Sequence, residues 1–212
     1  VYSQTNGNPF FTRQVLRSME DQGLIALDTA TGRWRWDMDA LRVHDVTASV
    51  VELLVGKMKE LPIDIRETLK VAACIGNQFD IAMLTVITAG DDDAILDHVQ
   101  EAVAAGLIWE HDDRGIFVHD RVQEAAYTLV PKEERDRLHL TIGRLLLQRL
   151  RTSDHEESLF RIVDQLNHGL HLVEDEQERM QLARLNLQAA GAARRAAAFD
   201  AGLTYARAGL ES

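Results

Sequence analysis

The 212-residue chain contains one cysteine, Cys74, and three prolines. A lone cysteine cannot form a disulfide within the chain or build a cysteine-based zinc site, and this usage suits a reducing cytosol. The chain also lacks any apolar run of about 18 residues, and its start, VYSQTNGNPFF, lacks the charged beginning and apolar centre of a signal peptide. We therefore expect a soluble, cytoplasmic protein. Its abrupt start is typical of mid-protein sequence, so we expect a piece of a longer chain.

Positive charge is scarce as well. Lys and Arg number 23 against 34 Asp and Glu, which gives a formal net charge of −11. Such a balance argues against a broad surface for nucleic acid or for an anionic membrane. With 46% hydrophobic residues, the chain is long enough to bury about 70% of its unfolded surface, as one domain or two small ones.

Catalytic and metal-binding motifs are largely missing. The nearest match to a phosphate-binding loop, residues 55–58 (VGKM), lacks the upstream glycine and the hydroxyl that would hold Mg²⁺. The pair His168 and His171 has no evident partner ligands, so a solvated helix face explains it better than a metal site. Residues 91–93 (DDD) precede a helix, where carboxylates cap N–H groups. Cys74 lies among apolar residues and is predicted to be inert core.

Apolar spacing predicts a mainly α-helical chain. After Pro9, apolar residues recur at helical spacing up to a C-terminal cap at Gly23. In residues 24–36 the pattern changes to that of a small β-hairpin, in which Trp34 and Trp36 alternate with arginines. A helix capped by Asp45 or Thr47 follows and ends near Leu61. This first segment, residues 1–61, is the first predicted domain.

Residues 62–130 form the second predicted domain. Their pattern gives helices at 65–75, 81–87 and 94–105, then strands at 107–110 and 116–119, which is the order of a winged helix. Asp120 and Gln123 form a capping-box pattern for a helix over 121–129. The third predicted domain, 131–212, begins with a helix over 133–150, and residues 199–210 resemble the second helix of a tetratricopeptide (TPR) unit.

The predicted winged helix is too acidic to read DNA. Residues 62–130 contain 13 acidic residues and 4 basic ones, and the expected recognition helix, 94–107, has no Lys or Arg. A winged helix that does not bind DNA is usually a packing or interaction module, and the fold alone does not say which of the two it is.

Two short motifs remain. The first, residues 7–11 (GNPFF), is explained locally as a turn that feeds a helix, with Asn8 as cap and Pro9 at the first helical position. The second, residues 118–120 (VHD), is explained locally as a strand residue, an exposed histidine and an N-cap.

Together, in this order and about 110 residues apart, the motifs resemble the region that follows the nucleotide-binding core of bacterial STAND-class AAA+ ATPases. The resemblance is greatest to large signalling proteins in which such a region lies between a serine/threonine kinase-like domain and a sensor histidine kinase. It extends through GRWRWD, LKVAACIGNQFD, HDRVQEAAY, IGRLLLQ and VDQLNHGL, and so covers nearly the whole chain.

The resemblance implies a lid over 1–61, a winged helix over 62–130 and a TPR-like helical arm over 131–212, with Walker A and B elements upstream. In related proteins a Gly-x-Pro motif packs its proline on adenine, which corresponds to Gly7, Asn8 and Pro9. A Met-His-Asp motif places its histidine on the ADP β-phosphate in the closed form, which corresponds to His119. Val118 replaces the methionine of that motif.

The implied function is the non-catalytic regulatory part of a signalling ATPase, which closes over ADP or ATP and relays nucleotide state to the arm. The parent protein is expected to be an ATPase and protein kinase, whereas no cofactor and no metal are expected on this chain alone. Expected partners are the upstream nucleotide-binding domain, proteins or a ligand on the arm, and a further copy of the fragment. The alternative is an interaction module without a nucleotide, with Trp34, Trp36 and Trp109 as partner anchors.

Overall fold

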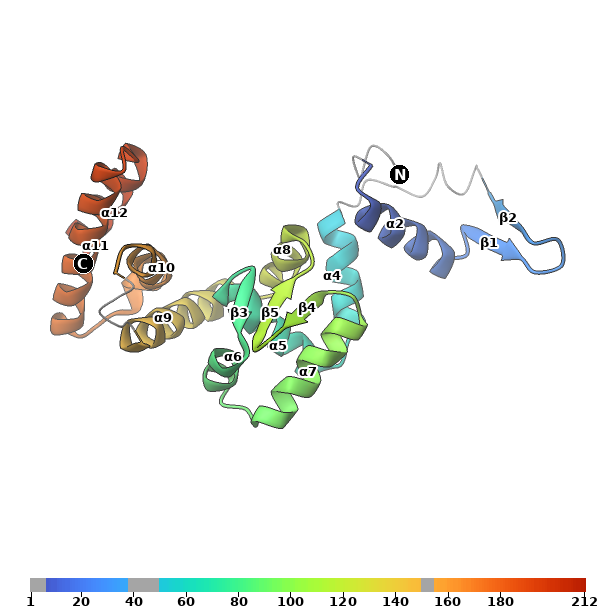
Figure 1. Cartoon of the computed structure of the whole chain (residues 1–212), viewed down its shortest axis with the longest axis horizontal. Helices are drawn as coiled ribbons and strands as arrows, with labels where there is room; N and C mark the ends of the chain where they lie inside the picture. Colours follow the sequence, from blue (N-terminus) through green and yellow to red (C-terminus); the bar gives the residue numbers. More distant parts are fainter. Residues whose placement is uncertain (1–6, 38–49, 150–154) are drawn as a thin grey trace.

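A computed structural model describes residues 7–37, 50–149 and 155–212. The chain is mainly helical with two small antiparallel sheets, which confirms the predicted fold class. Figure 1 shows an elongated molecule with an N-terminal helix and hairpin at one end, a mixed helical and stranded body in the middle, and a helical arm at the other.

The N-terminal part follows its sequence signals closely. Helix α2 (Pro9–Asp21) begins where Asn8 Oδ1 accepts hydrogen bonds from the backbone N–H groups of Phe10 (2.9 Å) and Phe11 (3.4 Å). Gly23 follows the helix with a φ of 72°, a left-handed conformation that glycine adopts without strain. Strands β1 (Ile25–Asp28) and β2 (Arg33–Trp36) form the predicted hairpin.

Helix α4 (Val50–Glu60) ends as predicted. Its proposed caps, Asp45 and Thr47, lie outside the described residues.

The body contains one strand more than the sequence predicted. Its elements are α5 (Ile63–Ile75), β3 (Gln78–Asp80), α6 (Ile81–Thr88), α7 (Asp92–Ala104), β4 (Ile108–His111) and β5 (Arg114–Phe117). The strand order is β3-β5-β4, with both pairs antiparallel. The added strand buries Phe79 against Gly115, where a Cβ atom would overlap the phenyl ring. The winged-helix assignment stays a prediction that this order supports.

One predicted helix cap is wrong, and another is right in position only. Helix α8 (Asp120–Thr128) is capped by His119, whose Nδ1 accepts the N–H of Arg121 at 3.1 Å. Gln123 does not complete a capping box, because its Nε2 donates to the carbonyl of Ala73 at 3.0 Å. Asp91 stands at the N-cap of α7, and Asp92 and Asp93 lie in its first turn, as predicted, but the Asp91 side chain makes no hydrogen bond to the helix.

The main core joins all three predicted segments. Phe11 of α2 and Met58 of α4 pack in the same buried cluster as Leu69 and Phe117 of the body. Ile142, from α9 (Lys132–Arg149), completes it. The N-terminal helices and the start of the arm are therefore packed on the body, although the domain boundaries themselves stay predictions.

The arm begins with α9 and continues with further helices. They are α10 (His155–His168), the short 3-10 helix η1 (Leu170–Leu172), α11 (Glu176–Arg195) and α12 (Phe199–Glu211). The α9 and α10 helices approach closely at Gly143, where a Cβ atom would lie 2.6 Å from the side chain of Leu166. Among the described helices, none is long and apolar enough to cross a lipid bilayer.

Candidate functional site

The two motifs singled out by the sequence meet at the first turn of α2. The ring of His119 lies edge-on to Phe11, with centroids 4.5 Å apart, and nearly parallel to Phe10 at 6.5 Å. Phe11 is buried in the main core, whereas His119 is half-buried. The end of β5 and the start of α2 thus form one local site, although they are far apart in the chain.

The hydrogen bond that caps α8 determines which ring nitrogen of His119 carries the proton. Because Nδ1 accepts the N–H of Arg121, the neutral imidazole carries its proton on Nε2. The Nε2–H group is therefore a hydrogen-bond donor that the cap does not use. A donor of this kind can bind a phosphate oxygen.

Pro9 lies on a different face of the same helix. It lines a groove of about 740 Å³ between α2 and the hairpin, together with Arg13, Trp34 and Trp36. The other lining residues are Gly7, Thr12, Leu16, Arg17, Glu20 and Ile25. The structure thus places His119 against the helix that begins at Pro9, while Pro9 itself lines the groove. Sequence reasoning predicted Gly7 and Pro9 for a binding site and missed the groove.

Asn8 has the local role that the sequence predicted. Its Oδ1 accepts two backbone N–H groups of α2, so this oxygen is occupied by the helix cap. A contact between Asn8 and a nucleotide stays a prediction.

Lys57, from the phosphate-loop-like fragment, has a structural role. Its Nζ donates to the carbonyl of Ala105 at 2.8 Å, just beyond the last residue of α7. Burial lowers the pKa of the Lys57 ammonium group, and the charges of Arg17 and Arg13 act in the same direction.

A directed chain of hydrogen bonds joins the body to the arm. Gln165 Nε2 donates to the carbonyl of Cys74 at 3.1 Å, so its Oε1 must accept from His139 Nδ1 at 2.7 Å. His139 Nε2 then accepts the hydroxyl of Tyr127 at 2.9 Å. We call these four residues the relay. It contains one residue from each of α5, α8, α9 and α10, and burial lowers the pKa of His139.

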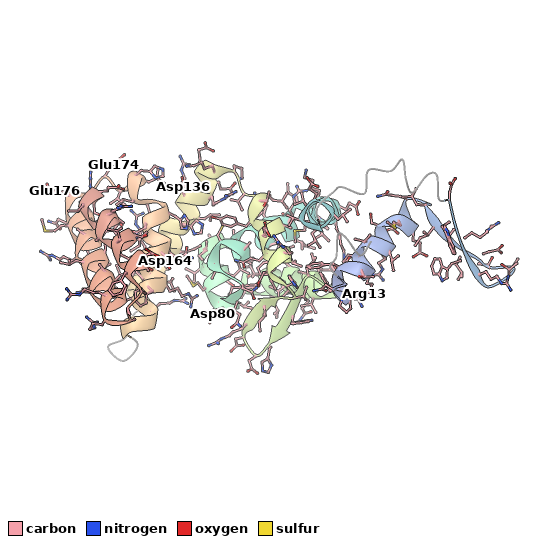
Figure 2. All side chains as sticks on the ribbon, turned by 90° about the horizontal axis from the view of Figure 1, so that it is seen from above. Arg13, Asp80, Asp136, Asp164, Glu174 and Glu176 are labelled. Carbon is pink, nitrogen blue, oxygen red and sulfur yellow. The ribbon has the colours of Figure 1, made fainter. Side chains whose placement is uncertain are left out.

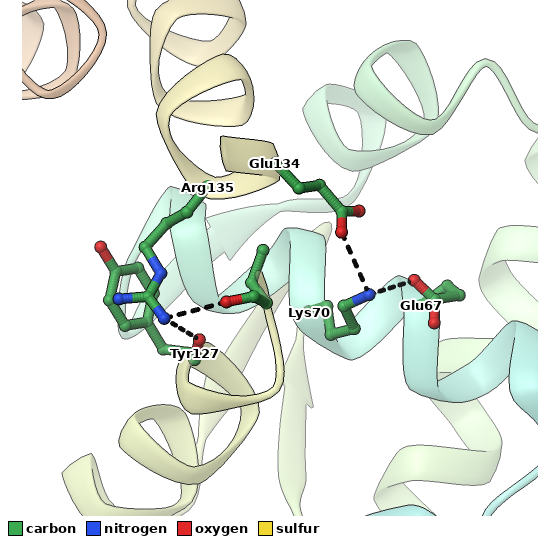
Figure 3. A network of polar contacts seen from close by, with 6 residues as sticks. Glu67, Lys70, Tyr127, Glu134 and Arg135 are labelled. Carbon is green, nitrogen blue, oxygen red and sulfur yellow. Dashed lines mark hydrogen bonds and ion pairs between the residues drawn. The ribbon is translucent and has the colours of Figure 1, made fainter. Parts of the chain in front are cut away.

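Charged groups surround the relay. Figure 3 shows Arg135 stacked on the Tyr127 ring, 4.2 Å from its centroid, and Lys70 between Glu67 (2.6 Å) and Glu134 (3.5 Å). Arg135 also donates to the carbonyls of Tyr127 (3.3 Å) and of Val130 (2.9 Å). These contacts hold the α8–α9 corner together.

The two histidines weighed as metal ligands also lie beside the relay. His168 stacks on His139 at 4.3 Å between centroids, and His171 Nε2 lies 3.5 Å from Asp136 Oδ2. Burial raises the pKa of the Asp136 carboxyl, but the hydrogen bond from Lys132 and nearby positive charges outweigh it and leave that pKa below its usual value. In the part of the chain that the structure describes, no group of three or more His, Cys, Asp or Glu side chains could hold a metal.

The groove lies at the N-terminal end of the molecule, whereas the relay lies where the body meets the arm. Figure 2 labels Arg13 on α2, beside the hairpin, and Asp136 and Asp164 in the arm. The body lies between the groove and the arm, so any signal from one to the other must pass through its helices.

All three tryptophans are exposed to solvent. Trp34, Trp36 and Trp109 expose 50%, 60% and 61% of their surface. Trp34 and Trp36 line the groove, whereas Trp109 lies on β4, far from it in the chain. Trp109 is therefore a suitable control for substitutions in the groove.

Comparison with known proteins gives a signalling context. No family model and no solved structure matches the chain. Over 258 residues it is 29% identical to "Hybrid signal transduction histidine kinase G" of Dictyostelium discoideum, a match that covers 97% of this chain and 8% of that protein. The chain therefore resembles a small part of a signalling protein. This relative is not bacterial, so the resemblance is not confined to the bacterial proteins expected from the sequence.

Proposed function

We propose that this chain is the non-catalytic regulatory part of a nucleotide-gated signalling protein of the STAND type. It closes over ADP held by an upstream nucleotide-binding domain, with Pro9 on the base and His119 on the β-phosphate. The observation that carries the proposal is the packing of the His119 ring on Phe11, together with the Nε2–H donor of His119, which the cap of α8 does not use. The similarity to a signalling histidine kinase supports the same context.

The mechanism is a two-state equilibrium. ADP favours the closed form because the bond from His119 to phosphate exists only while the end of β5 lies beside the nucleotide. ATP, or a ligand on the arm, favours the open form in which this bond is lost. Each ligand shifts the equilibrium only by its difference in affinity for the two forms.

The relay supports a route from the nucleotide to the arm. His119 caps α8, and Tyr127 near the end of the same helix bonds to His139 on α9, which bonds to Gln165 on α10. A movement of His119 therefore acts on a short helix whose other end is tied to the arm.

An ADP titration tests the proposal. Calorimetry compares this chain with a longer protein that extends upstream through a phosphate-binding loop, and compares His119→Ala with His111→Ala in the longer protein. His111 is an exposed histidine at the β4–β5 turn and serves as the matched control. We expect ADP to bind the longer protein alone, with weaker binding for His119→Ala and unchanged binding for His111→Ala. Equal affinity of the two variants would refute the role of His119.

The second candidate is an interaction module without a nucleotide. The three exposed tryptophans favour it, because tryptophan is enriched at interface hot spots. Absence of a phosphate-binding loop upstream of Val1 in the full-length gene product would favour this function over the first.

A further inference from the structure

The hairpin presents an apolar face that its own helix covers incompletely. The register pairs Ile25 with Trp36 and Leu27 with Trp34, so these four side chains share one face. Trp34 and Trp36 stay at least half-exposed, and Leu27 is 47% exposed. A two-stranded hairpin is marginal by itself in water, so such a face gains stability when something packs on it.

The facing wall of the groove carries positive charge. Arg13 and Arg17 follow Pro9 at helical spacing, and all three line the groove. Glu20, the acidic residue of the lining, comes a turn later and further from Pro9. The groove end near Pro9 is therefore locally basic on a chain whose net charge is −11.

These features together select a class of ligand. Indole rings stack on a flat heteroaromatic base, and guanidinium groups attract an anionic group attached to it. A volume of about 740 Å³ lies in the range of small-molecule sites, roughly 300–1,000 Å³. A purely apolar peptide would use the tryptophans and leave the two arginines unused, so charge complementarity favours a nucleotide.

We propose that Trp34 and Trp36 stack on the base of the adenine nucleotide and that Arg13 and Arg17 attract its anionic part. The inference rests on the proposed function, because it concerns the base of the same adenine nucleotide. Its new content is that the hairpin supplies the stacking surface for the base.

The test uses the longer protein that contains the upstream nucleotide-binding region. Calorimetry measures the Kd of ADP and of pyrophosphate, which lacks the base, for Trp34→Leu, Trp36→Leu and the control Trp109→Leu. Loss of one stacking partner should raise the Kd of ADP by about 5- to 150-fold. Pyrophosphate affinity should stay unchanged, and Trp36→Phe should recover part of the ADP affinity because it restores an aromatic face.

The possible failures are distinguishable. If the wild type binds ADP and His119→Ala weakens it, while the Trp34 and Trp36 variants behave like Trp109→Leu, base stacking is refuted and the proposed function stands. If the variants weaken ADP and pyrophosphate equally, the hairpin has only a structural role. If they leave ADP affinity unchanged but convert a dimer to a monomer in sedimentation, a second copy occupies the groove. Absence of ADP binding by the wild type refutes the proposed function and this inference with it.

Discussion

Replacing His139 should cost more stability than replacing any exposed histidine. Its side chain is buried, with 4% of the residue exposed, and it makes hydrogen bonds of 2.9 Å to Tyr127 and 2.7 Å to Gln165. A typical hydrogen bond contributes about 1 kcal/mol net, and a buried partner left unpaired costs about 1–3 kcal/mol. The Gln165 oxygen is such a partner, because its amide nitrogen is held by Cys74. We expect His139→Ala to lower the free energy of unfolding by about 3 kcal/mol.

Urea unfolding followed by far-ultraviolet circular dichroism measures this loss as a lower midpoint at constant slope. A second variant, His139→Phe, keeps a ring beside His168 and removes both hydrogen bonds, so we expect a loss of about 2 kcal/mol. The matched control is His111→Ala, whose side chain is 80% exposed, and it should change stability by less than about 0.5 kcal/mol. A loss below about 1 kcal/mol for both His139 variants would refute the directed relay.

Three further predictions follow from packing and titration. Gly143→Ala should lower the free energy of unfolding by about 1–3 kcal/mol, because the added Cβ would lie 2.6 Å from the Leu166 side chain. Gly56→Ala has open space around the added Cβ and should raise that free energy by about 0.5–1 kcal/mol. Equal urea midpoints for the two variants would contradict this reasoning. Burial lowers the pKa of His139, so the unfolded chain binds a proton at this residue more readily than the folded chain does. The difference in free energy of unfolding between wild type and His139→Phe should therefore shrink when the pH falls from 7 to 5. A larger difference at pH 5 would contradict this. Burial raises the pKa of the Cys74 thiol to about 12, so iodoacetamide at pH 8 should alkylate it, by mass spectrometry, only after unfolding.

Elements with strong local signals could be predicted from the sequence. The cap at Asn8, the proline after it and the glycine at position 23 fix α2 at both ends. Strand β3 was missed because its three residues show no extended alternation, and it exists through pairing with β5. The capping box at Asp120 and Gln123 failed because a distant carbonyl, that of Ala73, binds the glutamine side chain.

The site depended on contacts that no local pattern encodes. The motif residues Pro9 and His119 were identified by resemblance, but the packing of His119 on Phe11 follows from the tertiary fold. His139 lies in a helix with many charged residues and gave no sign of burial, since its burial requires α10. The groove required the hairpin face and α2 to be placed together, which the alternation of Trp34 and Trp36 suggests only in part.

The most direct test of the central claim is the affinity of ADP for the longer protein with and without His119. A hydrogen bond to a charged group contributes about 1.5–3 kcal/mol, so His119→Ala should weaken ADP binding by about 10- to 150-fold and increase signalling output. An unchanged Kd, with output also unchanged, would contradict a nucleotide switch at this site.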